Sequence, residues 1–131
     1  YIEIRSMDAC GWDCLCAGPA FFIGLLYGNL DEVFDVVKRW NLDEIISAYK
    51  DSPKKGLKKI LGKKSILDWS KDLFEISKQG LVNRNELNSK KQNEVKFLDH
   101  IKTIIDTNST NAEAIMAQYQ KDKNFFNINE K

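Results

Sequence analysis

The sequence predicts a mainly helical fold in one domain of 131 residues, with a strand at residues 1–6 and helices over residues 13–121. Over most of the chain, apolar residues recur at spacings of three and four, whereas only the first residues alternate with a period of two. The composition, 43% hydrophobic and 30% charged with two prolines, is typical of a globular protein. Residues 122–131 are predicted to form a loose tail.

The predicted strand at residues 1–6 has two different faces. Ile2 and Ile4 lie on one face, and Tyr1, Glu3 and Arg5 lie on the other. A single strand is not stable alone, because its edges and its apolar face need partners. We therefore expect its sheet partners to precede residue 1.

Three helices are predicted between residues 17 and 53. Residues 17–27 are apolar on all sides, with Pro19 in the first turn, which is typical of a buried helix. A second helix begins near Asp31 and Glu32 and carries an apolar stripe. A third carries another stripe and is expected to end at Pro53. The two stripes, both expected in the core, are Val33, Val36, Val37 and Trp40, and then Leu42, Ile45, Ile46 and Tyr49.

Caps and apolar stripes in the second half of the chain predict three more helical stretches. Ser65 can cap a long helix that ends near Gly80, and a polar loop is expected over residues 83–93. Thr110 and Glu113 have the spacing of a capping box at the start of a last helix. The core-facing residues expected in these helices are Ile66, Trp69, Leu73 and Ile76, then Val95, Leu98, Ile101 and Ile105, and finally Ile115, Met116 and Tyr119.

Charge and hydropathy exclude several classes of protein. Twenty Lys plus Arg against nineteen Asp plus Glu leave a net charge of +1, which is too little to hold a nucleic-acid backbone or an anionic membrane. The longest apolar run, residues 17–27, is about half of what a membrane-spanning helix needs. We therefore expect a soluble, cytoplasmic protein with no nucleic-acid or membrane partner.

The three cysteines do not indicate a metal site. Cys10, Cys14 and Cys16 have a spacing that fits neither a zinc knuckle nor a redox pair, and His100 is far away in the sequence. We expect free thiols that behave as small hydrophobic residues.

The segment between Lys50 and Lys64 contains seven lysines and one acid, Asp51. Such a segment could line a phosphate or nucleic-acid groove, although it lacks the aromatic residues and arginines that read bases. A solvated basic surface is the simpler interpretation. The segment leaves open an alternative function, a helical binding module that contacts an acidic partner or nucleic acid, and a third, a structural or oligomerisation domain.

Glu3 and Arg5 are the strongest candidates for chemistry. Two residues apart on one strand face, they are separated by roughly 6.6 Å along the strand, which suits two ends of one ligand. A carboxylate can hold Mg²⁺ and a guanidinium can bind a phosphate, so together they could serve a nucleotide-metal complex. The simpler interpretation is a solvated sheet face with two ordinary charges.

The segment YIEIRSMD, followed by the run W-x-x-x-C-A-x-P-A-F-x-x-G-L-L-Y over residues 12–27, resembles the C-terminal region of plant and proteobacterial glutamate-cysteine ligases. Later elements occur in the same order as in that family: Trp40, a Pro-x-x-Gly-Leu element at residues 53–57, Gly80-Leu81, Glu94-x-x-Phe97-Leu98 and Asn111-Ala112-Glu113. The resemblance covers nearly the whole chain, and its first 27 residues are the most specific part.

The resemblance implies an ATP-dependent ligase that joins glutamate to cysteine through γ-glutamyl phosphate, the first step of glutathione biosynthesis. It implies a larger α+β fold like that of glutamine synthetase, in which helices flank an antiparallel sheet. Glu3 would be a Mg²⁺ ligand, and Arg5 would contact the transferred phosphate of ATP. Both ATP and Mg²⁺ would need residues outside this chain, so we expect the chain alone to be inactive and its partners to be glutamate, cysteine, ATP and the rest of the ligase.

Overall fold

The computed structural model describes residues 3–4, 11–12 and 14–123. Within these ranges the chain folds into six α-helices and one small hairpin, which confirms the mainly helical prediction. The helices are α1 (Ala17–Ile23), α2 (Leu30–Val37), α3 (Leu42–Lys55), α4 (Ile66–Arg84), α5 (Asp99–Thr107) and α6 (Asn111–Lys121). A π-helical turn, η1 (Gly24–Gly28), follows α1, and the 3₁₀ turns η2 (Gly56–Lys58) and η3 (Glu94–Leu98) precede the hairpin and α5.

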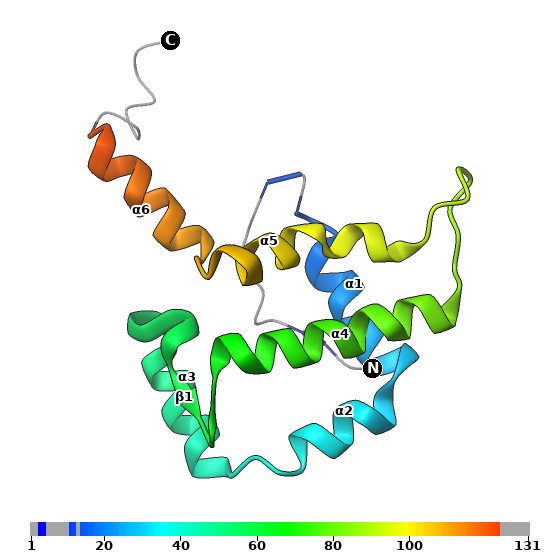
Figure 1. Cartoon of the computed structure of the whole chain (residues 1–131), viewed down its shortest axis with the longest axis horizontal. Helices are drawn as coiled ribbons and strands as arrows, with labels where there is room; N and C mark the ends of the chain where they lie inside the picture. The colour runs from blue at the N-terminus through cyan, green and yellow to red at the C-terminus, as the bar shows by residue number, and fades with distance from the viewer. Residues whose placement is uncertain (1–2, 5–10, 13, 124–131) are drawn as a thin grey trace.

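Helix α4 is the centre of the molecule. In Figure 1 it runs across the middle, with α5 above it and α2 below it, and α1 and η1 pack across it. Buried side chains on both sides of α4 form the core. One cluster joins Ala20, Phe74, Leu81 and Leu98, and the other joins Leu25, Val33 and Ile76. Most of the predicted stripes of α4 and α5 therefore face the core or its edge, as expected.

The start of α4 follows its prediction, but its end does not. Ser65 is the N-cap, and its hydroxyl accepts a hydrogen bond of 3.1 Å from the backbone N–H of Asp68. The helix continues through Gly80 and ends only at Arg84, where Asn85 takes a left-handed conformation with φ 52°. Gly80 is thus inside the helix, where it allows close packing rather than ending the helix. The predicted polar loop begins at Asn85.

Helix α3 passes through Pro53, so the expectation that this proline ends the helix is wrong. The missing N–H of Pro53 leaves the carbonyl of Tyr49 without its helical donor. Tyr49 is 81% exposed, so water can reach this turn. The helix ends two residues after Pro53, and Gly56 follows with φ 52°. Leu42, Ile46 and Tyr49 are exposed, so this stripe is not part of the core as predicted.

A two-stranded antiparallel hairpin connects η2 to α4, and the sequence did not predict it. Strands β1 (Ile60–Leu61) and β2 (Lys64–Ser65) are joined by a turn that contains Gly62 with φ 63°. The Trp69 indole donates a hydrogen bond of 2.8 Å to the Leu61 carbonyl, which holds the hairpin on α4. Trp40 packs edge-on against Trp69 with ring centroids 5.3 Å apart.

The capping box that begins α6 is confirmed. The Thr110 hydroxyl accepts from the Glu113 N–H at 3.2 Å, and the Glu113 carboxylate accepts from the Thr110 N–H at 2.8 Å. These bonds hold the Glu113 pKa below its ordinary value. The prediction that Ile115, Met116 and Tyr119 face the core is wrong, because all three are exposed. Figure 1 shows α6 extending away from the other described helices, in agreement with the exposure of these residues.

Only Glu3 and Ile4 of the predicted strand fall within the described residues. Neither belongs to a strand in this structure. A strand needs a neighbouring chain segment for its hydrogen bonds, and we expected those neighbours to precede residue 1. The strand at residues 1–6 therefore stays a prediction. Of the predicted loose tail, Asp122 and Lys123 are exposed, and residues 124–131 lie outside the described residues.

Candidate functional site

The side chains of Glu3 and Ile4 point to different environments. Glu3 is exposed, whereas Ile4 is half-buried and lines an apolar groove beside α1. Different environments for these two neighbours are what an alternating segment would give, in which Glu3 and Ile4 lie on opposite faces. The helical layer does not cover Glu3. Arg5, the other predicted site residue, lies outside the described residues.

The groove next to Ile4, here called the α1 groove, is open and has a volume of about 420 Å³. It is lined by Ile4, by Leu30 at the start of α2, and by apolar side chains of α1 and η1 between Pro19 and Tyr27. None of the described residues that line it is charged. The helix at residues 17–27, predicted to be buried, therefore packs on α4 by one face and leaves another apolar face open.

The position of this face is set by an unusually close approach of η1 to α4. A Cβ added to Gly80 would lie 2.0 Å from the Gly24 carbonyl oxygen, and one added to Gly28 would lie 2.4 Å from the Gly80 Cα. Real Cβ atoms do not approach backbone so closely, so only glycine fits at these positions. The two backbones are thus in direct contact.

Two hydrogen bonds hold the same crossing together. Ser77 is fully buried on α4, and its hydroxyl donates a hydrogen bond of 2.8 Å to the Phe21 carbonyl at the end of α1. The Asn29 amide, just after η1, donates to the Ile76 carbonyl at 3.1 Å. A side chain that inserts among helix carbonyls is a known cause of irregular turns, and here the irregular turn is η1. Both bonds therefore attach α1 and η1 to α4 at the glycine contact.

The described residues contain no group of three or more His, Cys, Asp or Glu side chains that could hold a metal ion. Glu3 can supply one carboxylate oxygen, whereas Mg²⁺ prefers six oxygen ligands in octahedral geometry. The donor type of Glu3 fits Mg²⁺, but a complete site would need ligands from beyond the described residues. Of the cysteines, Cys16 is exposed with a free thiol, whereas Cys14 is buried and disulfide-bonded, so the expectation of free thiols is wrong for Cys14.

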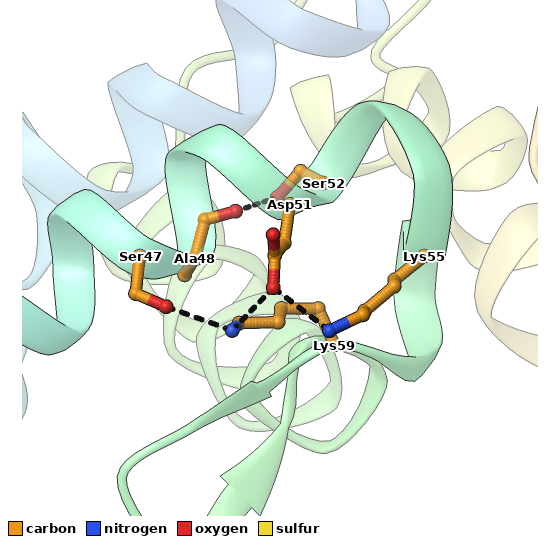
Figure 2. Close-up of polar contacts among 6 residues, drawn as sticks. All are labelled: Ser47, Ala48, Asp51, Ser52, Lys55 and Lys59. Carbon is orange, nitrogen blue, oxygen red and sulfur yellow. Dashed lines mark hydrogen bonds and ion pairs between the residues drawn. The ribbon is translucent and has the colours of Figure 1, made fainter.

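The lysine-rich segment is partly neutralised by acids of its own surface. Figure 2 shows Asp51 on α3 accepting from Lys55 at 2.8 Å and from Lys59 at 2.9 Å, while Lys59 also donates to the Ser47 hydroxyl at 3.0 Å. Lys64 pairs with Asp72 and lies over the Trp69 ring, 5.0 Å from its centroid. These pairs attach the segment to α3 and α4, which favours the simpler interpretation of a solvated basic surface.

The ion pairs of Asp51 with Lys55 and Lys59 make the free energy of unfolding depend on pH. Hydrogen bonds from Lys55 and Lys59 lower the Asp51 pKa from 3.8 to about 2. Because this pKa is lower in the folded state, the stabilisation is complete above the unfolded value and is lost as pH falls toward about 2. Asp51→Asn is expected to lower the melting temperature slightly at pH 7, and the difference should shrink steadily below pH 4. Melting curves from pH 2 to pH 7 measure this, and a difference that stays constant would contradict it.

The sequence interpretation missed the α1 groove. It treated residues 17–27 as wholly buried because their apolar residues cover every side of the helix. The available signal was a mismatch in size: one small helical domain offers few elements to cover a helix that is apolar all round. Tyr27 and Leu30 at the groove are 76% and 55% exposed.

Comparison with known proteins finds the same family over most of the chain. The profile of the family described as glutamate-cysteine ligase family 2 matches residues 1–127. The chain is 31% identical over 121 residues to a chloroplastic glutamate-cysteine ligase of Solanum lycopersicum, covering 91% of this chain and 22% of the tomato protein. It is 31% identical over 122 residues to chloroplastic ligase A of Oryza sativa subsp. indica (92% and 24%), and 30% identical over 121 residues to the chloroplastic ligase of Arabidopsis thaliana (91% and 22%).

The chain spans less than a quarter of the length of these relatives. Their names place them in chloroplasts, which lends no support to the predicted cytoplasmic location. No described helix is both long enough and apolar enough to cross a membrane. Because the family match covers residues 1–127, including the segment that carries Glu3 and Arg5, this chain belongs to glutamate-cysteine ligase family 2.

Proposed function

We propose that this chain is the helical C-terminal part of an ATP-dependent ligase that joins the γ-carboxylate of glutamate to the amine of cysteine. The observation that carries the proposal is the family match over residues 1–127, which contains both predicted site residues. The exposed Glu3, next to an inward-facing Ile4, supports it, since a metal ligand must reach a substrate cleft.

In the proposed reaction, a γ-carboxylate oxygen of glutamate attacks the γ-phosphorus of ATP, and ADP leaves. The cysteine amine then attacks the acyl carbon, loses a proton and expels phosphate, so that an amide bond forms. Both steps depend on positioning and on neutralising phosphate charge more than on covalent help from the protein. When bound, Mg²⁺ would neutralise part of that charge.

Glu3 and Arg5 would have different roles at the nucleotide, one toward the metal and one toward the phosphate. The Glu3 carboxylate would supply one of the Mg²⁺ ligands, and the Arg5 guanidinium would donate hydrogen bonds to oxygens of the transferred phosphoryl group. A strand is a suitable support because its backbone fixes both side chains on one face. The close η1–α4 crossing would support that strand from behind, through Ile4 and the α1 groove.

The test is an assay of the full-length protein that contains this chain. With glutamate, cysteine, ATP and Mg²⁺, we expect γ-glutamylcysteine, ADP and phosphate in equal amounts. If hydroxylamine replaces cysteine, it should trap the acyl phosphate as γ-glutamyl hydroxamate. ATP turnover that ignores both amino acids would contradict the proposal.

The alternative function, a helical module that binds an acidic partner or nucleic acid, predicts a different result. Its binding would weaken steeply with salt, because each lysine neutralised against phosphate releases counterions. It would also be indifferent to substitution of Glu3. The pairing of Lys55, Lys59 and Lys64 with acids of the same surface favours the ligase over this alternative.

A further inference from the structure

We propose that the pocket where α4 meets η3, here called the Arg84 pocket, binds a free α-amino acid with an apolar side chain through the charged pair Arg84 and Glu94. None of the described residues that line this pocket lines the α1 groove. The proposal does not depend on the roles of Glu3 and Arg5 or on the proposed ligase reaction.

The Arg84 pocket lies at the two ends of the loop that joins α4 to η3, at the right of Figure 1. Its volume is about 330 Å³, at the lower end of the roughly 300–1,000 Å³ that is typical of small-molecule sites. Like such sites, it combines apolar side chains with a few polar groups. The residues that would contact the ligand are Arg84, Glu86, Leu87, Glu94 and Phe97.

Arg84 and Glu94 form an ion pair that leaves hydrogen-bonding capacity unused. The Arg84 Nε lies 3.6 Å from the Glu94 Oε2, and both atoms are buried with no hydrogen-bond partner among the described residues. Buried polar atoms are normally paired, so a donor and an acceptor left unpaired side by side indicate that a further partner is missing. The two side chains are 29% and 30% exposed, so each is partly open to the pocket that it lines.

An α-amino acid is complementary to this pair, because it carries an ammonium and a carboxylate on the same carbon. Its carboxylate would accept hydrogen bonds from the Arg84 guanidinium, and its ammonium would donate to the Glu94 carboxylate. Glu86, in the same pocket, supplies a second carboxylate for the ammonium. A ligand with only a negative charge would be repelled by the two glutamates, and one with only a positive charge would leave the guanidinium unpaired.

The other walls of the pocket are apolar and are held in place by the loop itself. Leu87 and Phe97 are 52% and 38% exposed at the pocket, which suits an apolar ligand side chain. The Asn88 carboxamide oxygen accepts from the backbone N–H of Lys90 at 2.9 Å and from that of Gln92 at 3.0 Å, which fixes the loop. A pocket that is formed before the ligand arrives loses less free energy to ordering on binding.

Binding of L-leucine to the full-length protein that contains this chain tests the proposal. Saturation-transfer NMR observes the leucine methyl groups, and a titration gives the dissociation constant. Two analogues test the need for both charges, since isoamylamine lacks the carboxylate of leucine and isocaproate lacks its ammonium.

The variants that remove one charge from the pocket are Arg84→Gln and Glu94→Gln. Their matched control is Glu75→Gln, which breaks the 3.8 Å ion pair between Glu75 and Lys78 elsewhere on α4. Leu87→Trp fills the pocket from an exposed position and keeps both charges, so it tests the proposal even if a charge variant does not fold.

We expect leucine to bind with a dissociation constant of about 1 mM or lower, the range open to a small ligand with few contacts. Each pocket variant should raise this constant by roughly tenfold or more, and both analogues should bind more weakly than leucine by a similar factor, because one hydrogen bond to a charged group contributes about that much. Glu75→Gln should stay within about twofold of the wild type.

Three results would overturn the proposal: no binding of leucine, binding that the pocket variants leave unchanged, or an analogue that binds as tightly as leucine. Leucine is not a substrate of the proposed reaction and the measurement needs no turnover. Failure of this proposal is therefore distinguishable from failure of the proposed ligase function.

Discussion

Replacing Arg5 by Ala in the full-length ligase is expected to lower kcat by about 10²- to 10³-fold, the usual cost of removing one charge-stabilising donor from a transition state. The guanidinium would be lost while the strand remains, because residue 5 is predicted to share a strand face with Glu3, which is exposed. The steady-state rate of γ-glutamylcysteine formation measures the effect.

The matched control is Arg39→Ala. Arg39 is exposed just after α2, far in sequence from the predicted strand, and its loss removes the same charge from the protein. We expect its kcat to stay within about twofold of the wild type, since surface substitutions away from special features have small effects. If Arg5→Ala were as active as Arg39→Ala, Arg5 would have no role at the phosphate.

Gly80→Ala is expected to destabilise the helical region by about 2–3 kcal/mol, although alanine normally stabilises a helix interior by up to about 1 kcal/mol over glycine. The new Cβ would lie 2.0 Å from the Gly24 carbonyl oxygen and 3.1 Å from the Gly28 Cα, so the two backbones must separate. Separation would also stretch the buried hydrogen bond from Ser77 to Phe21. Urea unfolding of the full-length protein, followed by tryptophan fluorescence, measures the change.

The control for Gly80→Ala is Gln79→Ala on the same helix. Gln79 is exposed, so this alanine contacts no other backbone and should change stability by less than about 0.5 kcal/mol. A Gly80→Ala protein at least as stable as the wild type would show that the η1–α4 crossing is loosely packed.

Local signals in the sequence predicted the parts of the fold that depend on neighbouring residues. The cap at Ser65 and the capping box at Thr110 depend on residues three positions apart, and both are confirmed. The core stripes of α4 and α5 depend on helical periodicity, which the sequence displays directly.

The predictions that failed depend on what each helix packs against. Gly80 looked like a helix end, but η1 needs it inside α4 for close approach. Pro53 looked like a helix end, but the affected turn of α3 is exposed to water. The apolar residues of α6 looked like core, but periodicity shows only that a face is apolar and not whether another element covers it. Each of these outcomes depends on packing or solvent exposure in the folded structure, which no local pattern contains.

The same limit applies to the candidate site. The alternation of the first residues predicted that Glu3 and Ile4 would face opposite sides, in agreement with their burial. The α1 groove was missed because its significance depends on the segments that surround α1. The chemistry proposed for Glu3 comes from the spacing of two residues and from the resemblance.

The most direct measurement is the Mg²⁺ dependence of ligation in the full-length enzyme carrying Glu3→Gln, with Glu32→Gln on the exposed start of α2 as the matched control. Gln keeps the size of the side chain but removes the negative charge that Mg²⁺ prefers in a ligand. We expect half-maximal activity to need a Mg²⁺ concentration roughly tenfold or more higher in Glu3→Gln, while Glu32→Gln behaves as the wild type. The reason is that loss of even a residue that only orients a metal ligand typically lowers metal affinity by about tenfold or more. A Glu3→Gln enzyme with the Mg²⁺ dependence of the wild type would contradict the assignment of Glu3 as a metal ligand.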